Sequence, residues 1–206
     1  GKDSVLLLKA LCGLKTFYPK DFEIVAITLD MRFNNVDGDF SEIGKICDEY
    51  NVHYEIRRTE LYDIIFNVRK ESNPCSLCAR MRRGILHDTA KELGCNKIAL
   101  GHHFDDVIET TLMNMLNAGS YQTMMPKLHS DNFNGMELIR PLYYVREKDI
   151  VAWKNYNNLS FLQCACRFTE KISEDEIYAS KRKETKELIK GGIICGIIIF
   201  FASTIQ

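Results

Sequence analysis

The chain has 206 residues, 46% of them hydrophobic, which is enough to bury one sizeable core and favours a single domain. A formal net charge of −1 excludes a global basic field, so a nucleic acid would have to bind at a local patch. The eight cysteines are scattered and no signal peptide is visible, so we expect a cytoplasmic protein whose clustered cysteines hold a metal or act in redox chemistry.

Helix-like and strand-like segments alternate along the chain. The hydrophobic spacing predicts helices over 2–18, 39–51, 60–70, 76–94, 105–116 and 146–157. It predicts strands over 22–31, 52–59, 96–103 and 136–145, the last interrupted by Pro141. This alternation predicts an α/β fold, with a Rossmann-like, mostly parallel sheet and helices on both faces. The longest loop is expected over 119–136, as a candidate substrate or lid loop.

The chain ends in an apolar run, GGIICGIIIFFASTIQ. Its apolar part is shorter than the roughly 20 residues that span a bilayer. We therefore expect a buried or misplaced strand, or the product of a truncated or frame-altered gene, and no membrane partner.

Residues 1–4, Gly-Lys-Asp-Ser, stand at the start of the first expected helix. The free backbone N–H groups, the helix dipole, the lysine and the hydroxyl suit a phosphate, and Asp3 could hold Mg²⁺ against it. Taken alone, the same residues favour an ordinary capped surface helix. A phosphate site therefore needs support from elsewhere in the chain.

Residues 101–106, Gly-His-His-Phe-Asp-Asp, lie between an expected strand and an expected helix. Asp105 and Asp106 suit helix caps, but the carboxyl end of a parallel strand is where open α/β sheets bind ligands. Successive strand residues point to opposite faces, so His102 and His103 are not expected to share a metal. We favour a ligand site here over simple capping.

The cysteines give the strongest signal. Cys75 and Cys78 stand three apart at a helix start, which places both on one helix face. With Cys164 and Cys166 they can form a four-thiolate zinc site, a three-thiolate iron–sulfur site with an open iron, or a dithiol redox pair. The remaining cysteines occupy apolar positions and are expected to fill the core: Cys12, Cys47, Cys95 and Cys195.

Three arginines share the expected helix with the cysteine pair: Arg80, Arg82 and Arg83. A run of basic side chains usually forms a solvated helix face. Beside thiolates it would also lower thiol pKa values and attract phosphate.

Together, these stretches resemble the PP-loop ATP-pyrophosphatase superfamily and, within it, the tRNA 2-thiocytidine synthetase family. The resemblance runs from Gly1 to about Phe168 and rests on GKDS, PCSLCARMRRGIL, KELGCNKIALGHHFDDVIETTLMNML, MMPKL, IRPLYYVREKDI and FLQCAC. The superfamily's ATP site is a Ser-Gly-Gly-x-Asp-Ser loop after a first strand. Only GKDS is present, which implies a missing first strand and half a loop. We expect a PP-loop domain over 1–168, then a C-terminal helix and an atypical apolar tail over 169–206.

The resemblance also implies a nucleotide site. Its residues, by position, would be Gly1, Lys2, Asp3, Ser4, Thr28, Asp30, Gly101, His102 and Asp106. The first four would cradle pyrophosphate, with Asp3 as the Mg²⁺ contact. Thr28 would contact adenine, and Asp30 would lie near the ribose.

The residues implied for catalysis are Asp3, Cys75, Cys78, Arg82, Asp105 and Asp106. Cys75 and Cys78 match two of three ligands of a 4Fe–4S cluster. The third would be Cys164 or Cys166, with Cys166 preferred.

The implied activity is ATP-dependent tRNA thiolation. ATP would adenylate the C2 oxygen of a cytidine in the anticodon loop, and sulfur from a cluster-bound sulfide would displace AMP. The implied partners are tRNA, ATP, a sulfur donor such as a cysteine desulfurase, and a second copy in a homodimer.

Other interpretations stay open. A lysidine synthetase would not need the cysteines, and an iron-free 2-thiouridine synthetase could use Cys78 with one downstream cysteine. A zinc-stapled nucleotide- or RNA-binding module and an inactive fragment are the non-catalytic alternatives.

Overall fold

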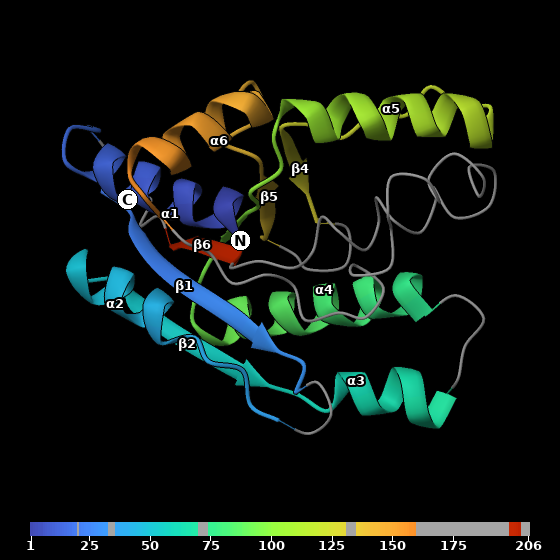
Figure 1. Cartoon of the computed structure of the whole chain (residues 1–206), viewed down its shortest axis with the longest axis horizontal. Coiled ribbons are helices and arrows are strands. Elements are labelled where there is room, and N and C mark those ends of the chain that lie inside the picture. Colours follow the sequence, from blue (N-terminus) through green and yellow to red (C-terminus); the bar gives the residue numbers. More distant parts are fainter. Residues whose placement is uncertain (20, 33–35, 70–73, 131–134, 160–197, 203–206) are drawn as a thin grey trace.

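The computed structural model contains a six-stranded sheet between layers of helices (Figure 1). It describes residues 1–19, 21–32, 36–69, 74–130, 135–159 and 198–202. The helices are α1 (Lys2–Lys15), α2 (Ser41–Glu49), α3 (Leu61–Asp63) with the π-helix η2 (Ile64–Arg69), α4 (Pro74–Glu92), α5 (Phe104–Ala118) and α6 (Glu147–Tyr156). The strands are β1 (Glu23–Asp30), β2 (His53–Arg58), β3 (Lys97–Ala99), β4 (Lys127–His129), β5 (Glu137–Ile139) and β6 (Ile198–Ala202).

The strands lie in the order β2-β1-β6-β3-β5-β4. β1 is parallel to β2, and β3 is parallel to β5. The two strands of each pair therefore have their carboxyl ends at the same edge of the sheet. β6 lies antiparallel between β1 and β3, with Ile27 opposite Ile198, and β4 is antiparallel to β5. The predicted α/β fold is confirmed, with a mixed sheet built around two parallel pairs.

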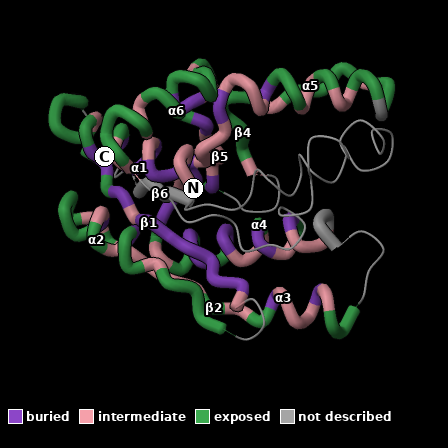
Figure 2. Tube along the Cα trace, in the orientation of Figure 1, coloured by how far each residue is buried: buried purple, intermediate pink, exposed green. Residues whose placement is uncertain are grey.

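The two faces of β1 pack against different helices, because successive side chains of a strand alternate. Ile24 and Ala26 belong to a core with residues of α1, α2 and α6. Ile27 and Leu29 belong to a second core with residues of α3, η2 and α4. Figure 2 shows the result as an almost continuously buried β1. The expected covering of both faces by helices is therefore confirmed.

Four predicted elements take a different form. The strand expected over 96–103 is only β3, Lys97–Ala99. Within the helix expected over 60–70, Leu61–Asp63 form the short α3 and Ile64–Arg69 form the π-helix η2. The strand expected over 136–145 is only β5, because Pro141 follows closely and residues 141–144 turn. The segment expected as the loop 119–136 contains β4, whose three exposed residues are too few to show a strand pattern in the sequence.

The apolar C-terminal run contributes β6, so the strand interpretation is confirmed for residues 198–202. The centre of the sheet, between β1 and β3, is thus occupied by residues from the end of the chain. Among the described residues, no helix is both long and apolar enough to cross a membrane. Cys12, Cys47 and Cys95 are buried as expected, while Cys195 lies outside the described residues.

Candidate nucleotide and thiolate site

The turn after β3 packs directly against the start of α1. A Cβ atom added to Gly101 would lie 3.2 Å from the backbone carbonyl carbon of Asp3 and 3.2 Å from the amide nitrogen of Ser4. Both neighbours are backbone atoms, so a larger residue at position 101 would push the two segments apart. The structure therefore brings the GKDS and GHHFDD stretches together.

Gly1 is the N-cap residue of α1, and its carbonyl oxygen accepts a hydrogen bond from the amide of Val5. The next residue, Lys2, is held between two carboxylates. Its Nζ lies 3.1 Å from Asp3 and 2.8 Å from Glu147, the first residue of α6. Burial alone would lower the pKa of Lys2, but the hydrogen bond to Glu147 and the charge of Asp3 outweigh it and raise that pKa.

His103 is the buried centre of this region. It precedes α5 as its N-cap residue and is 5% exposed. Its ring nitrogens lie 3.9 Å from Asp3 Oδ1 and 3.5 Å from Asp106 Oδ2. The N-termini of α1 and α5 thus place carboxylates around one imidazole.

Both aspartates of the GHHFDD stretch accept backbone hydrogen bonds. Asp106 Oδ2 accepts from the amide of His103 at 2.8 Å, and Asp105 Oδ2 accepts from the amide of Glu147 at 2.7 Å. Each carboxylate therefore caps a helix, as the simpler interpretation of these residues has it. The same contacts also fix the positions of the two carboxylates beside Asp3.

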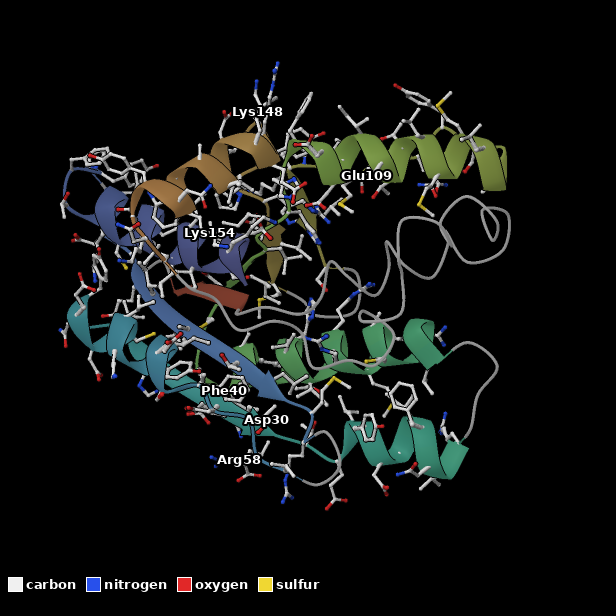
Figure 3. All side chains as sticks on the ribbon, in the orientation of Figure 1. Asp30, Phe40, Arg58, Glu109, Lys148 and Lys154 are labelled. Carbon is white, nitrogen blue, oxygen red and sulfur yellow. The ribbon has the colours of Figure 1, made fainter. Side chains whose placement is uncertain are left out.

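Negative charge accumulates here, and we name this group the acidic cluster: Asp3, Asp105, Asp106, Glu109 and Glu147. Burial raises the pKa of Asp106, and the charges of Asp3 and Glu147 add to the rise. The pKa of Glu109, labelled on α5 in Figure 3, is raised by burial and then by Asp106 and Glu147. Raised carboxyl pKa values indicate a place that would stabilise a bound cation.

His102 faces different partners from those of its neighbour. Its Nδ1 accepts a hydrogen bond from Arg140 Nε at 3.2 Å. Burial, and then the positive charges of Arg140, His103 and Arg83, lower the pKa of His102 to about 3, so the imidazole is neutral. We name Arg83 and Arg140, together with His102, the basic cluster. A role of His102 in the nucleotide site stays a prediction; in the structure its hydrogen-bond partner, Arg140, directly follows β5.

The carboxyl end of β1 holds Thr28 and Asp30, both buried. The Thr28 hydroxyl accepts a hydrogen bond from Tyr54 at 3.0 Å. Asp30, labelled in Figure 3, accepts from the amides of Arg32 at 2.9 Å and Gly38 at 3.0 Å. Asp30 thereby organises the loop after β1. Contacts of these residues with adenine and ribose stay a prediction.

The thiol of Cys78 lies at the same edge of the sheet. Its Sγ is 3.8 Å from the sulfur of Met31, the residue that follows β1. Cys75 lies one turn earlier on α4, and Arg82 lies one turn later and is 6% exposed. Cys164 and Cys166 lie outside the described residues, so the position of a third thiolate stays a prediction. Across the described ranges, no three His, Cys, Asp or Glu side chains form a ready metal site.

Three neighbours of the site were missed from the sequence: Glu109, Arg140 and Glu147. His103 was included only as part of the GHHFDD stretch, and its central place was not recognised. His103 stands three residues before Asp106, and this capping-box spacing could have identified it as the N-cap. Arg140 and Glu147 meet their partners only through tertiary packing, and no local pattern announces them.

The start of α1 lies against the turn after β3, in a sheet that helices cover on both faces. This arrangement is typical of the class of α/β proteins that bind ligands at the carboxyl edge of the sheet. The sequence profile described as the PP-loop domain matches residues 1–172. The chain therefore belongs to the PP-loop domain family.

Relatives of assigned function are also similar. The chain is 40% identical over 167 residues to the tRNA-cytidine(32) 2-sulfurtransferase of Geobacter sulfurreducens, covering 81% of this chain and 64% of that protein. It is 42% identical over 165 residues to the protein of the same name from Neisseria meningitidis, covering 80% and 51%. The chain thus spans between about half and two thirds of the length of these relatives.

A solved structure supports the fold. The U34-tRNA thiolase NcsA from Methanococcus maripaludis, determined with its 4Fe–4S cluster, matches with a TM-score of 0.63. The match covers 94% of this chain and 68% of that protein at 23% identity.

Proposed function

We propose that this chain carries the ATP-activating and sulfur-transferring part of a tRNA thiolation enzyme that acts on a cytidine of the anticodon loop. The observation that carries the proposal is the meeting of residues 1–4 with the 101–106 turn at the edge where Cys78 also lies. The relatives named tRNA-cytidine(32) 2-sulfurtransferase support the choice of base.

The reaction needs an activated pyrimidine, because a ring carbonyl oxygen is a poor leaving group. The C2 oxygen attacks the α-phosphate of ATP, forming an O-adenylyl group and releasing pyrophosphate. Sulfide then adds at C2, and the C–O bond breaks with loss of AMP. The backbone N–H groups at the start of α1 and the ammonium of Lys2 would receive the charge of the departing pyrophosphate.

The acidic cluster fits Mg²⁺. Among the described residues, Asp3 Oδ1 is a buried oxygen that accepts no hydrogen bond, although Lys2 Nζ lies nearby. Mg²⁺ is commonly held by one or two carboxylates together with substrate phosphates, so a complete protein cage is not required. Asp3 and Asp106 would hold the ion, which would supply positive charge beside the phosphates.

The thiolates of α4 fit an iron–sulfur cluster. Cys78 is partly exposed at the carboxyl edge of the sheet, and Cys75 precedes it by one helical turn. With Cys164 or Cys166 as the third ligand, a 4Fe–4S cluster would supply one open iron for sulfide. Arg82 would neutralise negative charge beside it, and the exposed arginines of α4 would guide the RNA backbone.

The test uses anaerobic reconstitution with iron and sulfide, followed by iron analysis and tRNA-dependent pyrophosphate release. Cys75→Ala and Cys78→Ala should lose the cluster and thiolation, while tRNA-dependent pyrophosphate release continues. Of Cys164→Ala and Cys166→Ala, only one should lose the cluster. Cys95→Ala, which changes a buried cysteine away from the edge, is the matched control.

Three results would contradict the proposal. Full cluster retention in all four of these cysteine variants would remove the iron–sulfur step. One bound zinc and no iron would favour the non-catalytic module. Pyrophosphate release without any thiolated cytidine in the tRNA would favour another member of the family.

A further inference from the structure

Arg140 is a buried cation without a carboxylate. It follows β5 directly and is 9% exposed. Its Nε donates to His102 Nδ1 at 3.2 Å, and its Nη1 donates to the carbonyl oxygen of Met125. Within the described ranges, no ion pair includes its guanidinium. A buried charge that only neutral groups contact is unfavourable unless an anion compensates it.

A second cation, Arg83, comes from α4, the helix that packs against β3 shortly before His102. Arg83 is exposed on α4, and its positive charge lowers the pKa of both Arg140 and His102. His102 contributes a neutral imidazole ring. Its Nδ1 already accepts the hydrogen bond from Arg140. The proton of the neutral imidazole is therefore on Nε2, where it can be donated. Two cations and one neutral imidazole thus lie in this part of the molecule, and the charges that act on His102 are all positive.

We propose that Arg140, Arg83 and His102 form a phosphate-binding site at the carboxyl edge of β3 and β5, separate from the acidic cluster. The planar guanidinium matches two phosphate oxygens at once, and two of its five N–H groups are used by the contacts above. This site extends the proposed function. It rests on that function only for the source of the phosphate, which is either the nucleotide or the RNA backbone.

The position of the site suits both sources. The turn 101–103 joins the site to the acidic cluster, since His102 and His103 are consecutive. On the other side, Arg83 follows Arg82 and Cys78 along α4. The amide of Arg140 also donates to the carbonyl oxygen of Pro126 at 2.8 Å, so the segment before β4 is fixed beside the site. A phosphate here would therefore contact the nucleotide turn, α4 and this segment together.

The probe is inorganic phosphate, added at constant ionic strength to the full chain labelled with ¹⁵N-arginine. The Nε–H resonances of Arg140 and Arg83 are assigned with Arg140→Lys and Arg83→Lys. Both resonances should shift in a saturable way. Arg83→Gln should weaken binding about tenfold, which is the usual effect of losing one charge-assisted hydrogen bond. Lys91→Gln, an equal charge change at an exposed position of α4, should leave the affinity unchanged.

Competition identifies the source. If AMP displaces phosphate and an anticodon stem-loop RNA does not, the site binds the nucleotide; the reverse result assigns it to the RNA backbone. Three outcomes would overturn the proposal: no saturable shift at Arg140, equal weakening by Arg83→Gln and Lys91→Gln, or binding of an adventitious ion only, with neither competitor effective. Because the measurement needs neither pyrophosphate release nor iron, its failure is distinct from failure of the thiolation proposal.

Discussion

The acidic cluster and the basic cluster meet at two consecutive histidines, yet their chemistry is opposite. His103 lies among the carboxylates of Asp3, Asp105 and Asp106. His102 accepts a hydrogen bond from Arg140, and the positive charge of Arg83 contributes to its lowered pKa. The extended backbone before α5 directs the two rings to different partners. A single turn therefore separates an acidic region from a basic region by one residue.

Under the proposed function, this separation would serve adenylyl transfer. The reaction must hold a cation against a departing pyrophosphate and also hold anionic substrate groups in line with it. Placing both charges in one undivided pocket would let them neutralise each other. The described ion pairs agree with such a division: Lys2 pairs inside the acidic cluster, and none links that cluster to Arg83 or Arg140.

The largest expected effect is on the acidic side. Under the proposed function, Asp3→Asn removes the negative charge nearest to the helix start that would bind pyrophosphate, so tRNA-dependent pyrophosphate release should fall by about 10²- to 10³-fold. The fold should persist, because the change removes repulsion from the cluster. Asp48→Asn, at an exposed position near the end of α2, is the control. Equal rates for both variants would show that the acidic cluster is not catalytic.

The next prediction concerns the thiols, which differ between α4 and the core. Burial, and then the neighbouring Cys12 and Asp48, raise the pKa of Cys47 to about 12. In iron-free protein at pH 8, iodoacetamide should therefore modify Cys47 at least about 100-fold more slowly than the partly exposed Cys78. Peptide mass spectrometry measures both rates, and denatured protein is the control. Equal rates in the folded protein would mean that Cys78 is not available at the edge.

Much of this arrangement could be predicted from the sequence. The GHHFDD stretch follows a strand and precedes a helix, so its place at the carboxyl edge follows from topology alone. The hydrophobic spacing around Cys78 likewise predicted that this residue lies on a helix. Local patterns suffice wherever the chain itself joins a site residue to a strand end.

The basic cluster could not be predicted in this way. Arg140 meets His102 only because β5 lies beside β3 in the sheet, and IRPL carries no sign of that pairing. The same limit applies to β6: its apolar composition indicated a strand, but nothing local indicated a place between β1 and β3. Glu147 likewise reaches Lys2 through the packing of α6 on α1.

Glu137 offers a carboxylate in the opposite environment to that of the acidic cluster. Hydrogen bonds from Lys127 and Lys97, each at 2.7 Å, lower the pKa of Glu137 to about 2. Because the pKa of this carboxyl group is lower in the folded state than its ordinary value of about 4.3, the ionised form stabilises the folded protein at any pH above that value. This stabilisation is lost as the pH falls toward 2. Glu137→Gln should therefore lower the free energy of unfolding by about 1 kcal/mol at pH 7.

Urea denaturation between pH 7 and pH 3 tests this difference. The gap between wild type and Glu137→Gln should narrow as the pH falls below about 4.3. Glu23→Gln, an exposed glutamate of β1, should show no such narrowing. A gap that stays constant with pH would mean that packing, and not the two lysines, causes the loss.

The smallest expected effect has the opposite sign and comes from Glu109. Its pKa is raised, so the folded state favours the protonated form and loses stability as the pH rises above about 4.3. Glu109→Gln should therefore raise the free energy of unfolding by about 0.5 kcal/mol at pH 7.5 and change nothing at pH 4. Millimolar Mg²⁺ should shrink the gain, because a cation relieves the same repulsion that the substitution removes. Glu42→Gln, exposed on α2, should respond to neither pH nor Mg²⁺ in this way. If Glu109→Gln lowered the free energy of unfolding instead, the Glu109 carboxylate would make a favourable contact. Glu109 would then not belong to the acidic cluster.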